Sequence, residues 1–164
     1  MENILSKQFQ RQHEMMIEWV NGIIEPLSDE EFKMELSPGK NNGVWLLGHL
    51  IVSDDDFSEF MGKGEAIFPQ YIIFFGQGSK ILPAESYPPV TELKDAWKKV
   101  SDKNRKIYSG LSDDELQQPH ALVKDFDNDY FKTKERVIMA WHLHQLYHAG
   151  QLGILVARSG KSKY

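Results

Sequence analysis

The 164-residue chain contains no cysteine. Disulfide bonds, thiolate metal ligands, iron–sulfur clusters and a cysteine nucleophile are therefore excluded. Any metal ion would have to be held by imidazole, carboxylate or water oxygen, which narrows the search for a site to histidine, aspartate and glutamate.

Long apolar runs and an excess of basic residues are also missing. No stretch approaches the ~20 apolar residues that a membrane-spanning helix needs, so we expect no membrane span. The first residues, MENILSKQFQRQHEMM, have no apolar core resembling a signal peptide, and a cytoplasmic location is the default expectation. The net charge of −5 argues against binding to nucleic acid or to anionic lipid, because both need a basic surface.

The residues that are present fit a folded protein. Hydrophobic residues make up 41% of the chain and charged residues 26%, which is typical of a soluble globular protein. The length suits one domain with its own core, so we expect residues 1–164 to form a single domain.

Four long segments carry apolar residues at steps of three and four, the spacing of an amphipathic helix. The pattern predicts helices over about 4–24, 42–62, 91–111 and 133–158. Pro26, Gly62 and Gly160 supply helix ends. The segments LSDEEF and LSDDEL each contain a capping box, which predicts two short helical turns.

The connections between these helices differ in length. Residues 63–90 are first aromatic and then rich in proline. A strand over 71–75 is possible, but a lone strand would have no partner. We therefore predict a long connection with short helical pieces. Residues 117–132 are expected to form a loop or a short extended hairpin. The chain is therefore predicted to be an all-α four-helix bundle, in which the long connection between helices 2 and 3 permits a crossover.

The segment WHLHQLYHAGQL, residues 141–152, concentrates three of the six histidines. On a helical wheel His144 and His148 share one face with Trp141 and Gln151, which we predict to look inward, whereas His142 points away. Residues four apart have Cβ atoms roughly 5–6 Å apart, so both imidazoles can reach one metal ion. The alternative is that the pair is hydrogen-bonded within a polar layer of the core.

His49, in the middle of the second predicted helix, lies beside another apolar stripe. A neutral histidine there needs partners for both ring nitrogens. Three inward histidines on two helices could share one ion and leave a coordination position open, which is the pattern of a catalytic rather than a structural site.

The two motifs around these histidines resemble those of the DinB/YfiT-like superfamily. The family signature is a tryptophan-and-leucine run ending in Gly-His-Leu, paired with His-x-x-x-His-x-Gly-Gln; here the matching segments are WLLGHL, residues 45–50, and HQLYHAGQL, residues 144–152. The resemblance implies a four-helix bundle with a long crossover. It also implies a divalent metal, nickel or zinc, held by His49, His144 and His148, and a homodimer.

The resemblance further implies a class of reaction. Characterised relatives include transferases and isomerases that use low-molecular-weight thiols, so the expected function is a metal-dependent thiol S-transferase or isomerase, or a metal-assisted hydrolase using bound water. Expected partners are a thiol or another small-molecule substrate. The alternative is a non-catalytic, metal-stabilised binding module or a stress-associated interaction protein, and no catalytic base is assigned.

A second set of residues lies near the predicted site. Asp56 either accepts a hydrogen bond from a ligand imidazole or acts as a base, or it is a solvated member of the acidic run SDDD, and we favour the last of these. Gln151 is a candidate hydrogen-bond partner for a ligand imidazole, with helix packing as its alternative. His13 could line the pocket, but we expect a core histidine with satisfied ring nitrogens, and His120 has no assigned role. The aromatic residues of 68–75 are expected to pack on the bundle, although they could cover the site or form a dimer surface.

Overall fold

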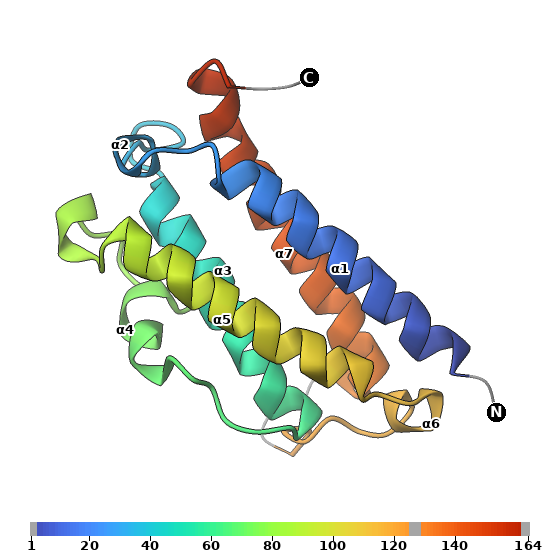
Figure 1. The fold of residues 1–164 in the computed structure, drawn as a ribbon. Coiled ribbons are helices and arrows are strands. Elements are labelled where there is room, and N and C mark those ends of the chain that lie inside the picture. The colour runs from blue at the N-terminus through green and yellow to red at the C-terminus, as the bar shows by residue number, and fades with distance from the viewer. Residues whose placement is uncertain (1–2, 125–128, 162–164) are drawn as a thin grey trace.

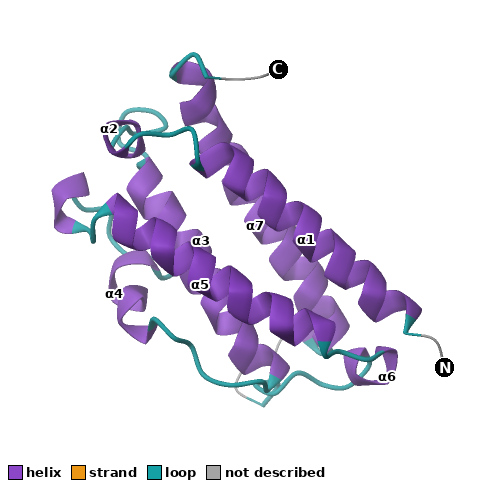
Figure 2. Ribbon diagram, viewed as in Figure 1, coloured by secondary structure: helices purple, strands orange, loops and turns teal. Residues whose placement is uncertain are grey.

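The computed structural model describes residues 3–124 and 129–161. Its four long helices are α1 (Ile4–Ile24), α3 (Gly43–Met61), α5 (Val90–Ser109) and α7 (Lys134–Arg158). Helices α1 and α7 run in one direction and α3 and α5 in the other (Figure 1). The predicted all-α four-helix bundle with a long crossover is thus confirmed, and within the described ranges all regular elements are helical (Figure 2).

The ends of the helices follow the local signals in the sequence. Ser28 and Glu31 form the predicted capping box at α2 (Asp29–Phe32), in which the serine N–H donates to the glutamate carboxylate at 2.7 Å. Ser112 caps α6 (Asp113–Leu116) by accepting the N–H of Glu115 at 3.2 Å. Helix α3 ends at Gly62, whose φ of 66° lies in the left-handed region that glycine adopts without strain.

The crossover between α3 and α5 contains short helical pieces, as predicted, and the alternative of a strand over 71–75 is wrong. These pieces are the 3₁₀ turns η1 (Pro69–Tyr71) and η2 (Ala84–Ser86) and the single-turn helix α4 (Ile72–Phe75). The side chains of Tyr71 and Phe75 are 3% and 0% exposed. This aromatic segment therefore packs on the bundle, as expected.

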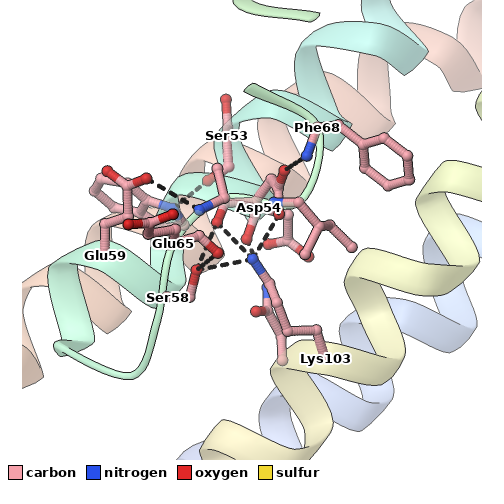
Figure 3. A network of polar contacts seen from close by, with 12 residues as sticks. Ser53, Asp54, Ser58, Glu59, Glu65, Phe68 and Lys103 are labelled. Atoms are coloured by element: carbon pink, nitrogen blue, oxygen red, sulfur yellow. Dashed lines mark hydrogen bonds and ion pairs between the residues drawn. The ribbon is translucent and has the colours of Figure 1, made fainter. Parts of the chain in front are cut away.

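Asp55 in α3 fastens the crossover to the bundle. Its carboxylate accepts the backbone N–H groups of Ile67 at 3.0 Å and Phe68 at 2.6 Å. The ammonium of Lys103, which extends from α5, lies 2.5 Å from the same carboxylate and donates to the hydroxyl of Ser58 at 2.8 Å (Figure 3). One buried ion pair thus joins α3, α5 and the start of the crossover.

The connection between α6 and α7 is partly extended. Pro119 and Thr133 form an antiparallel bridge, and the N–H of His120 donates to the carbonyl of Lys132 at 3.3 Å. The 3₁₀ turn η3 (Asp129–Phe131) precedes α7. Residues 125–128, on which part of the predicted loop or hairpin falls, lie outside the described residues.

The buried face of α7 differs from the predicted one. Ile138, His142, Gln145, Ala149 and Leu152 face the core, and His142 is only 2% exposed, so the prediction that it points away is wrong. Helix α7 packs against both α1 and α3. Val137 and Leu155, which share the predicted face with His144 and His148, are also buried, so the buried face is broader than the predicted stripe and its centre is rotated from it by less than one residue step of about 100°. His144 and His148 lie at the half-buried edge.

Apolar residues from all four long helices and from the crossover form the core. Charged residues interrupt the apolar pattern of the helices. In the part of the chain that the structure describes, no helix has the length and apolar character needed to cross a membrane.

Candidate metal centre

Three histidines from two helices converge between α3 and α7. His49 comes from α3, and His144 and His148 lie one turn apart on α7. One ring nitrogen from each lies within 4.8 Å of the other two, and no other three histidine, aspartate or glutamate side chains of the described residues share this spacing. The Nε2 atoms of His49 and His144 are 3.1 Å apart.

The ring of His49 is held on two sides. Its Nδ1 lies 2.7 Å from the carbonyl oxygen of Phe75, and because a carbonyl only accepts hydrogen bonds, Nδ1 carries the proton. The indole of Trp45 stacks on the ring at 4.7 Å and donates its own N–H to the Ser79 hydroxyl at 3.0 Å. The unprotonated Nε2 of His49 therefore points toward His144.

Gln151 orients His148 in a similar way. The amide oxygen of Gln151 lies 2.7 Å from Nδ1 of His148, one turn away on α7. The amide nitrogen of Gln151 donates to the hydroxyl of Tyr147 at 3.4 Å, which is consistent with the oxygen facing the imidazole. The predicted hydrogen bond between Gln151 and a ligand imidazole is present, and it leaves Nε2 of His148 as the acceptor nitrogen.

The surroundings keep all three rings uncharged near neutral pH. Burial lowers the pKa of His49, partly offset by its hydrogen bond to Phe75. Burial, followed by repulsion from His148 and His49, lowers the pKa of His144 to about 4. Burial also lowers the pKa of His148 against the opposing effect of Gln151. Neutral imidazole is the form that binds metal ions.

This arrangement fits a divalent transition metal. Two imidazole nitrogens that are each about 2.0–2.1 Å from one ion, at angles between octahedral and tetrahedral, lie about 2.9–3.4 Å apart. The observed 3.1 Å between His49 and His144 falls in that range, and it equally suits a hydrogen bond between the two rings in the absence of an ion. A set of three imidazoles suits zinc or nickel, and three protein ligands leave at least one coordination position for water or substrate.

The acidic run on α3 is more buried than charge runs usually are. Asp54 and Asp55, for which the sequence predicted no role, are 3% and 1% exposed. Asp56 is half-buried, and burial, followed by the nearby Glu59 and Asp55, raises its pKa to about 6. Nδ1 of His49 donates to the Phe75 carbonyl instead, and Nδ1 of His148 donates to the amide oxygen of Gln151.

The remaining histidines lie outside this cluster. His13 is 1% exposed, as expected of a core histidine, and neither ring nitrogen has a hydrogen-bond partner among the described residues. His120 is also 1% exposed and packs on Phe60 at 5.2 Å. The carbonyl of Phe75 was not predicted, since every residue has a carbonyl group and only the fold selects this one.

The fold and the cluster define a helical-bundle protein with three converging histidines between two of its long helices. The chain belongs to the DinB superfamily, whose family model matches residues 8–152. It is similar in fold to the crystal structure of a conserved protein from Enterococcus faecalis, with a TM-score of 0.71 and 11% identity over 96% of this chain and 98% of that one. No curated protein matches the chain.

Gly48 is expected to be essential for the position of Phe75. A Cβ at residue 48 would overlap the Phe75 ring, so Gly48→Ala forces that ring, and with it the carbonyl that orients His49, away from α3. We expect a loss of about 1–3 kcal/mol in unfolding free energy, measured by urea denaturation.

The matched control is Gly150→Ala on α7, where a Cβ would meet no heavy atom within 4 Å. That change should be neutral or stabilising by up to about 1 kcal/mol, because alanine favours a helix more than glycine does. Equal stability of Gly48→Ala and wild type would contradict the packing argument.

Proposed function

We propose that the protein binds one divalent metal ion, nickel or zinc, through Nε2 of His49, His144 and His148. The observation that carries the proposal is the convergence of the three imidazoles, with two Nδ1 atoms already engaged by Phe75 and Gln151. Such partners fix the tautomer and the orientation of a metal-binding ring before the ion arrives.

We propose further that the centre is catalytic. A bound divalent ion with an open position lowers the pKa of a coordinated water or thiol and so supplies a nucleophile near neutral pH. The chain contributes uncharged imidazoles, the buried side chains of Trp45 and Phe75, and the half-buried position of His144 and His148 at the edge of α7. The proposed reaction is transfer or isomerisation with a low-molecular-weight thiol, or metal-assisted hydrolysis.

The test begins with untagged protein, since a polyhistidine tag would itself bind metal. Elemental mass spectrometry should find about one equivalent of zinc or nickel per chain. The metal-loaded protein is then incubated with glutathione or bacillithiol and a panel of electrophiles, and thiol consumption is compared with that of chelated protein. Metal-loaded protein that neither binds nor consumes a thiol, and hydrolyses no ester or amide in the same panel, would contradict the catalytic proposal.

The alternative is a metal-stabilised binding module without turnover. Its specific support is that the ligands join α3 to α7, so that a bound ion would cross-link two helices of the bundle. A large fall in melting temperature on metal removal, together with no response in the substrate panel, would favour this alternative.

We also propose that the chain forms a cytoplasmic homodimer that binds no nucleic acid. The support for the homodimer is an exposed apolar stripe on α7, formed by Met139, Leu143 and Tyr147 at 47%, 63% and 64% exposure. Such contiguous apolar surface is typical of interfaces. Light scattering coupled to size-exclusion chromatography would detect the dimer, and a monomer at high micromolar concentration would rule it out.

A further inference from the structure

A second group of polar side chains lies inside the bundle and includes none of the three proposed ligands. We call it the core polar cluster, and every long helix contributes to it: His13, Asp54, Asn104, Tyr108, His142 and Gln145. None of these residues is more than 3% exposed. Buried polar side chains are normally hydrogen-bonded, so each polar atom of the cluster should have a partner.

The cluster is partly connected by direct contacts. The Tyr108 hydroxyl lies 2.9 Å from Nε2 of His142, and the Tyr108 ring stacks on His13 at 4.2 Å. The amide nitrogen of Gln145 donates to the Asp54 carboxylate at 2.8 Å, and that of Asn104 donates to the Asp54 carbonyl at 2.7 Å. Tyr108 lies one turn after Asn104 on α5, and His142 lies three residues before Gln145 on α7, so the two halves are neighbours.

Several polar atoms of the cluster have no hydrogen-bond partner within the described part of the protein. They are both ring nitrogens of His13, Nδ1 of His142, Oδ2 of Asp54, Oδ1 of Asn104 and Oε1 of Gln145. Native proteins leave few buried polar atoms unpaired, so this many in one place indicates a bound group that bridges them.

The chemistry of these atoms selects the bound group. Each imidazole carries at least one N–H donor, and in its neutral form its second ring nitrogen accepts. The oxygens of Asp54, Asn104 and Gln145 accept. A cation would face ring N–H donors, and an anion would face Asp54. Water both donates and accepts, and it fits the mixed set.

We propose that the core polar cluster binds buried water molecules that bridge His13 and His142 to Asp54, Asn104 and Gln145. The bridges tie α1 and α7 to α3 and α5 in one relative arrangement. Gln145 also donates to the carbonyl of Leu50 at 3.1 Å, and Leu50 follows His49 in the chain. The proposal uses no property of the metal centre, and it stands whether or not that centre binds an ion.

The test is His13→Phe, because a phenyl ring retains the stacking on Tyr108 and removes only the two nitrogens. If waters bridge His13 to the opposite helices, the variant removes one end of each bridge and leaves the polar groups at the other end without a partner. We then expect the melting temperature to fall by about 3–8 °C. A rise in melting temperature would show that the nitrogens had no partners, and it would overturn the proposal.

A second measurement distinguishes lost bridges from a poorly fitting ring. Oxygen-17 relaxation dispersion counts internal waters that stay longer than the protein takes to tumble. We expect such waters in wild type and fewer in His13→Phe; equal counts would overturn the proposal. The proposal would also be overturned if wild type bound a second equivalent of zinc that His13→Phe does not bind, since the cluster would then hold a metal ion.

Discussion

His148→Ala is expected to abolish stoichiometric metal binding. Only two imidazoles remain, and the hydrogen bond from Gln151 no longer orients a ligand. We expect the metal content to fall from about one equivalent to near zero after dialysis against metal-free buffer, as measured by elemental mass spectrometry. A metal that binds only the folded state adds about 2.7 kcal/mol at one hundred times its dissociation constant, so wild type should also lose about 5–10 °C in melting temperature on chelation.

The matched control for this experiment is His120→Phe. It removes a histidine outside the triad and retains an aromatic ring against Phe60. This variant should keep the full metal content and the full stabilisation by metal. Wild type without metal after reconstitution with zinc and with nickel would contradict the site itself, and metal that persists in His148→Ala would place the site elsewhere.

The sequence predicted the convergence of the three histidines from one local pattern and one family resemblance. His144 and His148 are one helical turn apart, so their proximity follows from the helix alone. His49 required tertiary information, which the resemblance of WLLGHL to the family signature supplied. The helix boundaries were also predictable, since Ser28, Gly62 and Ser112 act on adjacent backbone.

The rest of the arrangement depends on packing that periodicity does not specify. The helical wheel of α7 contains two overlapping apolar stripes, and the choice between them is made by its contacts with α1 and α3. With the stripe that packs against α1 and α3, His142 and Gln145 are buried, and His144 and His148 lie at the half-buried edge. Nothing local distinguishes Asp55 from its acidic neighbours, because its partners Lys103, Ile67 and Phe68 belong to other elements.

Asp55 and Lys103 matter because they fix the crossover segment whose Phe75 carbonyl orients His49 in the proposed metal centre. The Asp55 carboxylate is 2% exposed and the Lys103 side chain 18%. Figure 3 shows the lysine ammonium surrounded by oxygen acceptors of α3. Removing one partner of a buried ion pair leaves the other charge unpaired, which costs about 3–5 kcal/mol in fully buried cases.

Lys103→Met is therefore expected to lower the unfolding free energy by about 2–4 kcal/mol, a range reduced for the partial exposure of the lysine. Methionine retains most of the aliphatic part of the lysine side chain, so the loss of unfolding free energy measures the contribution of the ammonium charge and its hydrogen bonds. Urea denaturation measures it, with the exposed Lys98→Met on the same helix as a control that should change stability by less than about 0.5 kcal/mol.

The double variant Lys103→Met with Asp55→Asn separates the ion pair from the anchoring of the crossover. If the cost of Lys103→Met comes from an unpaired carboxylate, neutralising Asp55 should restore part of the stability. Asparagine can accept only through its one amide oxygen, whereas the carboxylate serves both Ile67 and Phe68. The double variant should therefore still bind metal more weakly than wild type, because the crossover that positions the Phe75 carbonyl on His49 is held less firmly. Additive losses in stability would instead show that the two side chains act independently.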